Sequence, residues 1–205
     1  MTMYLPFARL CNFAGSYSLL RFLGRHSLAL LLFSFSACST LPRSDMQDAG
    51  PGFWKAEGKL GIRSQTKAQS ANFVWENMNR DYLIQLFGPL GQGRVHIEKN
   101  GSEVTLTHKG QHSTARSAQE LLYLETGIVM PVHWLNSWIK GKPSPESIIT
   151  DAVYEDEGRL AQFQQSDWLV TYSRYEQIQD QKLPTKMILK HADYTLTIII
   201  KSWGL

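Results

Sequence analysis

Apolar and polar residues alternate with a period of two along most of the chain after residue 52. In residues 53–63, Trp54 and Leu60 fall on one face and charged residues such as Lys55 on the other, as in a strand with one buried face. Apolar positions two residues apart recur in the segments 71–75, 82–86, 95–97, 104–106, 160–164, 168–172, 187–189 and 194–201. Turn residues such as Asn100-Gly101 separate these segments, so the pattern predicts about nine to eleven antiparallel strands.

The middle of the chain has a helical pattern instead. Ser117 and Glu120 form a capping box, and Gly127 is placed to end the helix that they begin. The residues expected on its inner side are Leu121, Leu122 and Leu124. A second helix is predicted over residues 132–139, before the stop signal Gly141. The residues that share its apolar face are Leu135, Trp138 and Ile139.

The predicted fold is mainly β with α: a barrel or strongly curled antiparallel sheet whose open side is covered by the short helices. A curled sheet lined by aromatic side chains can enclose a hydrophobic cavity. The candidates for the cavity wall are Trp54, Leu60, Phe73, Trp75, Tyr82, Ile84, Leu86, Trp134, Leu135 and Trp138. The alternative is that these side chains fill a solid core, as large apolar residues usually do.

The start of the chain reads as a targeting segment. Arg21 and Arg25 precede an apolar run over residues 28–35, which is followed by Ser36-Ala37 and Cys38. This order is typical of a signal peptide, and a cysteine at the cleavage point is typical of a bacterial lipoprotein. We therefore expect a signal peptide over residues 1–37, lipidation at Cys38, a flexible tether over 38–52 and a domain over 53–205. The alternative is an ordinary secreted protein in which the cysteine is incidental.

Composition and charge narrow the class of protein. The expected leader carries three of the 21 Lys and Arg residues and none of the 18 Asp and Glu residues, so the rest of the chain has a formal charge of zero. A neutral domain without a basic cluster argues against nucleic acid as a partner. Cys11 would leave with the leader and Cys38 would carry lipid, so no disulfide is expected.

Motifs for catalysis, phosphate binding or metal binding are absent from the sequence. His108 and His112 are four residues apart, but the residues between them read as a turn, which argues against a shared metal site. The acidic run 155–158 reads as a solvated turn. We expect a protein that is not an enzyme and that needs no cofactor or metal.

One loop is unusual. Gly88-Pro89-Leu90-Gly91 lies between two predicted strands, and its proline and glycines favour a tight turn. Leu90 would then lie at the apex of the turn. Its side chain is either exposed there or folded back over the core, and the spacing alone does not distinguish the two.

Several stretches of the chain occur together in one family. They are Cys38-Ser39, Phe53-Trp54, Phe73-Val-Trp75, the Gly88–Gly91 loop, and the run from Gly127 through Pro131, Leu135, Trp138 and Gly141 to Pro143. Together they resemble the LolB family of outer-membrane lipoproteins. The resemblance covers nearly the whole chain after Cys38, and its most specific parts are the loop and residues 131–143.

The resemblance implies an unclosed antiparallel β-barrel with helices as a lid over a hydrophobic cavity. It also implies a monomeric receptor, lipid-anchored at the periplasmic face of the outer membrane, that accepts lipoproteins from a LolA-like periplasmic carrier. Their acyl chains would enter the cavity before insertion into outer-membrane lipid, and Leu90 would serve that insertion. The first alternative is a lipid-sensing or glycolipid-carrying lipoprotein of the same fold. A tethered lipid hydrolase and a purely structural envelope lipoprotein are further alternatives.

Overall fold

The computed structural model describes residues 52–205, and the expected leader, Cys38 and the tether up to residue 51 lie outside the described residues. The strands are β1 (Phe53–Ser64), β2 (Ala68–Met78), β3 (Asp81–Phe87), β4 (Val95–Asn100), β5 (Glu103–His108), β6 (Gln111–Ala115), β7 (Ile149–Tyr154), β8 (Leu160–Gln165), β9 (Trp168–Ile178), β10 (Gln181–Lys190) and β11 (Tyr194–Gly204). The helices are α1 (Ala118–Thr126) and α2 (Val132–Trp138), with short 3₁₀ turns η2 (Pro89–Gly91) and η3 (Asp156–Gly158).

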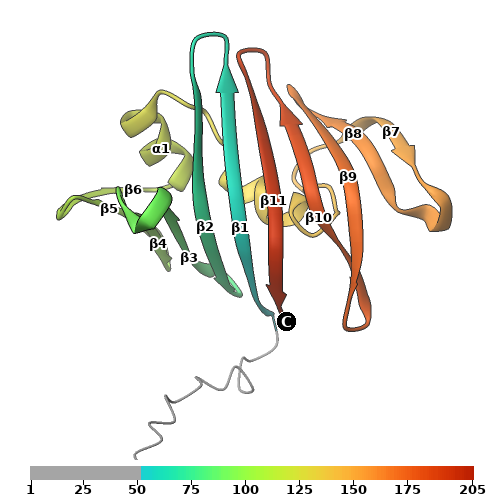
Figure 1. Ribbon diagram of the computed structural model, residues 1–205, viewed down its shortest axis with the longest axis horizontal. Coiled ribbons are helices and arrows are strands. Elements are labelled where there is room, and N and C mark those ends of the chain that lie inside the picture. Colours follow the sequence, from blue (N-terminus) through green and yellow to red (C-terminus); the bar gives the residue numbers. More distant parts are fainter. Residues whose placement is uncertain (1–51) are drawn as a thin grey trace, which may run out of the picture. The chain divides into compact units, whose positions relative to one another are not determined.

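All eleven strands form one antiparallel sheet in the order β6-β5-β4-β3-β2-β1-β11-β10-β9-β8-β7. The first and last strands, β1 and β11, therefore pair in the middle of the sheet, while β6 and β7 are its two free edges. The sheet curls, and both helices lie between these edge strands in the sequence (Figure 1). This confirms the predicted unclosed, curled sheet with short helices.

The apolar residues that alternate along β1 and β2 form the buried face of each strand. Trp54, Ala56 and Leu60 are buried on β1, and Phe73 and Trp75 are buried beside them on β2. In antiparallel pairs this register places like faces together, so the apolar rows of neighbouring strands form one continuous surface. The core of the domain is built on that inner surface.

Gly58 occupies a position in β1 that excludes a side chain. The pairing of β1 with β11 shifts by one residue between Glu57 and Gly58. A Cβ atom on Gly58 would lie 2.0 Å from the carbonyl oxygen of Ile199. Only glycine lets the two backbones approach this closely.

Helix α1 has the predicted ends. The hydroxyl of Ser117 accepts a hydrogen bond from the Glu120 backbone nitrogen at 3.2 Å, and Gly127 ends the helix with a φ of 73°. The expectation that Leu124 faces inward is wrong, because its side chain is 71% exposed. The buried residues of α1 are Ala118, Leu121 and Leu122. At 3.6 residues per turn, Leu124 lies roughly 110° from the centre of their face.

Helix α2 is held against strands β8 and β9. The Trp138 ring packs against Phe163 and Trp168, with centroids 6.3 and 6.0 Å away. The hydroxyl of Tyr172 donates a hydrogen bond to the carbonyl oxygen of Trp138 at 2.7 Å. Among residues 52–205, neither helix has the length and hydropathy needed to cross a membrane.

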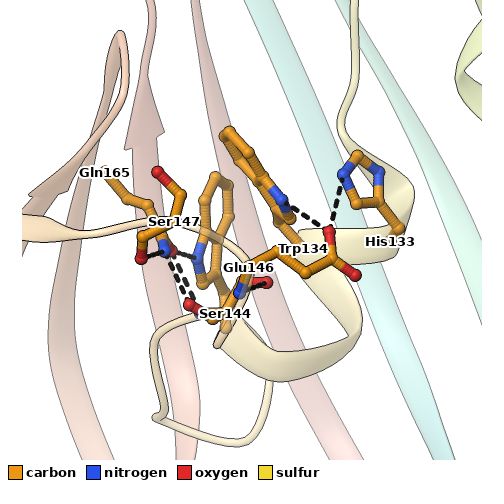
Figure 2. Close-up of polar contacts among 7 residues, drawn as sticks. His133, Trp134, Ser144, Glu146, Ser147 and Gln165 are labelled. Carbon is orange, nitrogen blue, oxygen red and sulfur yellow. Dashed lines mark hydrogen bonds and ion pairs between the residues drawn. The ribbon is translucent and has the colours of Figure 1, made fainter.

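The segment after α2 is fixed by one buried side chain, Gln165 (Figure 2). Its oxygen accepts hydrogen bonds from the Trp138 indole nitrogen at 2.7 Å and the Ser144 backbone nitrogen at 3.0 Å. Its nitrogen donates to the carbonyl oxygens of Ser144 at 2.8 Å and Ser147 at 2.7 Å. All four hydrogen-bonding positions of the amide are therefore used.

Two edge strands and one strand boundary were not evident in the sequence pattern. Strand β6 is polar except for Ala115 at its end, and the residues of β7 are almost all exposed, so neither shows an apolar row. Pro184 lies inside β10, although it reads as a residue before a strand. The pairing of β9 and β10 is irregular immediately after Pro184, which is how a strand accommodates a residue that cannot donate a ladder hydrogen bond.

Candidate functional site

A cavity of about 690 Å³ opens between the curled sheet and the helices. Strands β1 to β4 and β11 form one wall, and the end of α1, the connection 127–131 and α2 form the other. Its volume is within the range of protein sites that bind small ligands.

Six of the ten residues proposed for the cavity wall line it: Leu60, Phe73, Trp75, Ile84, Leu86 and Leu135. The first five point inward from three neighbouring strands, and Leu135 faces them from α2. These apolar residues come from both sides of the cavity, so the sheet and the helix each contribute hydrocarbon surface.

The other four proposed residues do not line the cavity, and the expectation is corrected for them. They are Trp54, Tyr82, Trp134 and Trp138. Trp54 packs against Trp75 and Trp203, with ring centroids 5.3 and 5.8 Å away. Because its neighbours are rings rather than open space, Trp54 helps to fill the solid part of the core. Trp54 therefore fits the alternative that large aromatic side chains fill a solid core.

Tyr82 and the two tryptophans of α2 also contact other side chains. Tyr82 packs edge-on against Trp75, with ring centroids 6.3 Å apart. The indole nitrogen of Trp134 donates to the carboxylate of Glu146 at 3.1 Å, and the same carboxylate oxygen lies 3.4 Å from His133 Nε2 (Figure 2). Trp138 donates to Gln165.

Several cavity residues were not among the candidates. The strands supply Ile62, Val95, Ile97, Tyr194 and Ile198, and the helical segment supplies Leu122, Ile128, Met130, Val132 and Ile139. The strand residues were detectable, since they continue the same alternation. Ile128 and Met130 lie in an irregular connection, where no periodic signal marks an inward residue.

Among the described residues that line the cavity, only Lys67 and Glu125 carry charge. The hydroxyl of Tyr194 donates to the carbonyl oxygen of Val129, which ties the connection after α1 to the sheet. The phenol of Tyr194 is protonated at neutral pH and can donate this bond, and burial raises its pKa further above the ordinary value of 10.0. The arrangement suits binding of apolar chains more than proton transfer or nucleophilic attack.

No group of three or more metal-ligating side chains occurs among residues 52–205. His108 and His112 lie on β5 and β6, on either side of a turn, and His112 Nδ1 is 2.9 Å from the hydroxyl oxygen of Thr107. The acidic run of residues 155–158 is exposed and includes the turn η3. Glu157 there forms ion pairs with Arg159 and Lys182.

The Gly88–Gly91 loop presents Leu90 to solvent. The Leu90 side chain is 96% exposed, so it is not folded back over the core. Its backbone has a φ of 60°, a left-handed conformation that is unfavourable for leucine. The Gly88 nitrogen donates to the Gln92 carbonyl oxygen at 2.8 Å, and the Gly91 nitrogen donates to the Gly88 carbonyl oxygen at 3.1 Å. The loop is thus closed by its own hydrogen bonds while its largest apolar side chain points outward.

Comparison with known proteins identifies the family. Residues 53–203 match the family model described as outer membrane lipoprotein LolB. The chain is 36% identical over 157 residues to the outer-membrane lipoprotein LolB of Cellvibrio japonicus (strain Ueda107), covering 74% of this chain and 77% of that protein. It is 29% identical over 185 residues to the protein of the same name from Marinomonas sp. (strain MWYL1), covering 86% of this chain and 96% of that protein.

A third relative supports the same family assignment. The outer-membrane lipoprotein LolB of Francisella tularensis subsp. tularensis (strain WY96-3418) is 36% identical over 153 residues, which cover 73% of each chain. The family match extends from the start of β1 into β11, so it includes the whole cavity and the Leu90 loop. From the matched length and these identities, the chain belongs to the LolB family of outer-membrane lipoproteins.

Proposed function

We propose that this protein is a receptor at the outer membrane that accepts lipoproteins from a LolA-like periplasmic carrier and inserts them into the membrane. The observation that carries the proposal is the apolar cavity of about 690 Å³ between sheet and helices. Acyl chains exposed to water cost about 25 cal/mol per Å² of apolar surface, so a transported lipoprotein needs such a cavity at each step.

Transfer from carrier to receptor to membrane requires no covalent step in this proposal. A ligand moves between sites according to its relative affinities, so a gradient of affinity toward the bilayer is enough. The cavity wall supports this, because the part formed by residues 52–205 is mostly hydrocarbon and carries charge only at Lys67 and Glu125. We therefore propose a binding and transfer protein that is not an enzyme and that acts as a monomer.

Two further features are assigned roles in the proposal. Cys38, which lies outside the described residues, would carry the lipid anchor. Leu90 would enter the acyl region of the bilayer, because an aliphatic side chain that is 96% exposed on a closed loop can be buried there without rearranging the core. The cavity lining includes Gly88 and Gln92 from the same loop, so insertion of Leu90 would bring the cavity mouth to the lipid.

A transfer assay with a buried-charge variant tests the proposal. A purified LolA-like carrier loaded with an acylated lipoprotein is mixed with the purified protein, and the cargo bound to each is measured. Leu135→Glu puts a carboxylate into the cavity wall and should strongly reduce acceptance. Leu124→Glu makes the same change on an exposed part of α1 and should leave acceptance near normal.

The outcomes separate this function from its alternative. Circular dichroism and thermal unfolding must show that Leu135→Glu is folded. Equal acceptance by folded Leu135→Glu and by the unaltered protein would contradict the cavity as the binding site. If the unaltered protein takes no cargo from the carrier but retains a glycolipid, the alternative of a glycolipid-carrying lipoprotein is supported instead.

A further inference from the structure

Three neighbouring connections lie at the same end of the sheet. In a run of antiparallel strands, alternate turns share one end, so the β1–β2, β3–β4 and β5–β6 connections lie together. Leu90 is in the middle connection. The pairing supports this placement, because Val95 at the start of β4 is opposite His108 at the end of β5.

These three connections carry positive charge and no negative charge. Arg63 and Lys67 flank the first turn, Arg94 follows the Leu90 loop, and Lys109 is in the third turn. All four are exposed, and none forms an ion pair with another described residue of the chain. The stretches 63–68, 87–95 and 108–111 contain no aspartate or glutamate.

The opposite end of the same strands has a mixed charge. The β2–β3 connection ends at Asp81, which lies 3.7 Å from Lys99, and the β4–β5 connection ends at Glu103. Among the turns of β1 to β6, the purely basic ones therefore lie at the end that carries Leu90, and the adjoining β10–β11 turn at that end carries Asp193. Lys67 lines the same cavity as Gly88 and Gln92 of the Leu90 loop, so one of the cations is at the cavity itself.

We propose that Arg63, Lys67, Arg94 and Lys109 form a docking surface for the headgroups of anionic phospholipids. This inference rests on the proposed function and specifies which lipid surface the Leu90 loop enters. An exposed aliphatic residue between cations is the pattern by which peripheral proteins bind an anionic bilayer, the apolar side chain entering the acyl boundary and the cations contacting phosphates. A bilayer accounts for both features, whereas an acidic protein surface would account for the cations and leave Leu90 unexplained.

The test uses the lipid-anchored protein reconstituted into vesicles, so that attachment to the membrane is the same in every sample. An environment-sensitive fluorophore on Gln92→Cys, beside Leu90, reports entry of the loop into the bilayer. Vesicles are made of phosphatidylcholine alone or mixed with phosphatidylglycerol. We expect loop insertion to be favoured by phosphatidylglycerol and weakened by added salt, because the attraction is electrostatic.

A pair of matched variants assigns the effect to the docking surface. Each cation near an anionic surface contributes about fivefold to binding, so Lys67→Gln/Arg94→Gln should reduce the insertion equilibrium on the mixed vesicles by about 25-fold. Arg80→Gln/Lys201→Gln removes the same charge from exposed positions away from these turns and should have little effect. Thermal unfolding checks that both double variants are folded.

Three results would overturn the proposal. Equal loop insertion with and without phosphatidylglycerol would show that anionic headgroups are not recognised, while leaving the membrane role of Leu90 intact. Loss of insertion in all vesicles would instead contradict the proposed function at its membrane step. If Lys67→Gln/Arg94→Gln inserts normally on the mixed vesicles, the cations do not bind anionic headgroups, and reduced acceptance of cargo by Arg94→Gln alone would show that they bind the carrier protein.

Discussion

The indole nitrogen of Trp138 donates a 2.7 Å hydrogen bond to the side-chain oxygen of Gln165, and both residues are completely buried. The bond joins α2 to the end of β8, and the remaining bonds of Gln165 hold the chain at Ser144 and Ser147. Since Leu135 and Ile139 of the same helical segment line the cavity, this polar contact fixes part of the cavity wall.

Replacing Gln165 by leucine should therefore destabilise the domain. The Gln165→Leu change leaves the Trp138 indole, the Ser144 amide and two carbonyl groups without partners in the interior, at about 1–3 kcal/mol for each unsatisfied group. We expect a loss of about 3 kcal/mol or more in the free energy of unfolding, measured by urea titration. Gln164→Leu, one residue earlier and on the less buried face of β8, is the control. Similar free energies of unfolding for the two variants would contradict the role of Gln165 in anchoring α2 and the segment after it.

A second prediction concerns Gly58 in β1, and Gly61 in the same strand provides the control. Gly58→Ala would place a Cβ atom 2.0 Å from the Ile199 carbonyl oxygen, whereas Gly61→Ala would place one 3.9 Å from the Thr197 carbonyl oxygen. The first contact forces β1 and β11 apart, and overpacking of this kind costs about 1–3 kcal/mol or more. Thermal unfolding should show a clear loss for Gly58→Ala and a small change for Gly61→Ala. An equally small change for both would mean that the strands separate easily here.

The strands with a clear alternation, such as the one around Trp54 and Leu60, could be predicted from the sequence, as could the capped ends of α1. The same alternation could not distinguish residues that line the cavity from residues that fill the core. Trp54 and Leu60 both face inward from β1, but the space beside Trp54 is filled by Trp203, a residue from the far end of the chain. That difference depends on packing between distant segments, which a local pattern does not contain.

The exposure of Leu90 was also undetermined in the sequence. Proline and glycine indicated a tight turn, but an outward or an inward leucine satisfied the same spacing. The direction of the side chain follows from the left-handed backbone at Leu90 and the hydrogen bond from Gly88 to Gln92. Strand β7 was missed for a related reason, since an exposed edge strand has no buried row to reveal it.

Stability should fall at alkaline pH partly because of Tyr82. Burial raises the pKa of its phenol from 10.0 to about 12. Below pH 10 the phenol is protonated in both the folded and the unfolded chain, but between these two values only the unfolded chain releases the proton, which favours unfolding. Tyr82→Phe should therefore show a smaller loss of stability than the unaltered protein as the pH rises from 10 to 12.

The matched control for this pH dependence is Tyr154→Phe, since the Tyr154 ring is exposed on the edge strand β7. Urea unfolding at each pH gives the comparison. If Tyr82→Phe and the unaltered protein lose stability in parallel, the Tyr82 phenol does not contribute to the alkaline transition.

Leu90→Glu should separate acceptance of cargo from its insertion. The side chain is 96% exposed, so thermal stability and acceptance from the carrier should stay near those of the unaltered protein. Burying a leucine in lipid contributes about 1.5–3 kcal/mol, so delivery to vesicles should fall by roughly 10- to 100-fold. Leu90→Met keeps an apolar side chain and should retain delivery. A marked drop in thermal stability, or equal losses of acceptance and delivery, would show that Leu90 has a different role.

Photocrosslinking from inside the cavity tests most directly whether acyl chains bind there. A photoreactive phenylalanine analogue is placed at Phe73, which lines the cavity, or at Phe53, which is not among the residues of the cavity wall. The protein then receives an acylated lipoprotein from the carrier and is irradiated, and mass spectrometry locates the bond. We predict a crosslink from position 73 to an acyl chain and almost none from position 53. Equal crosslinking from both positions, or none from position 73 when cargo is bound, would contradict the account.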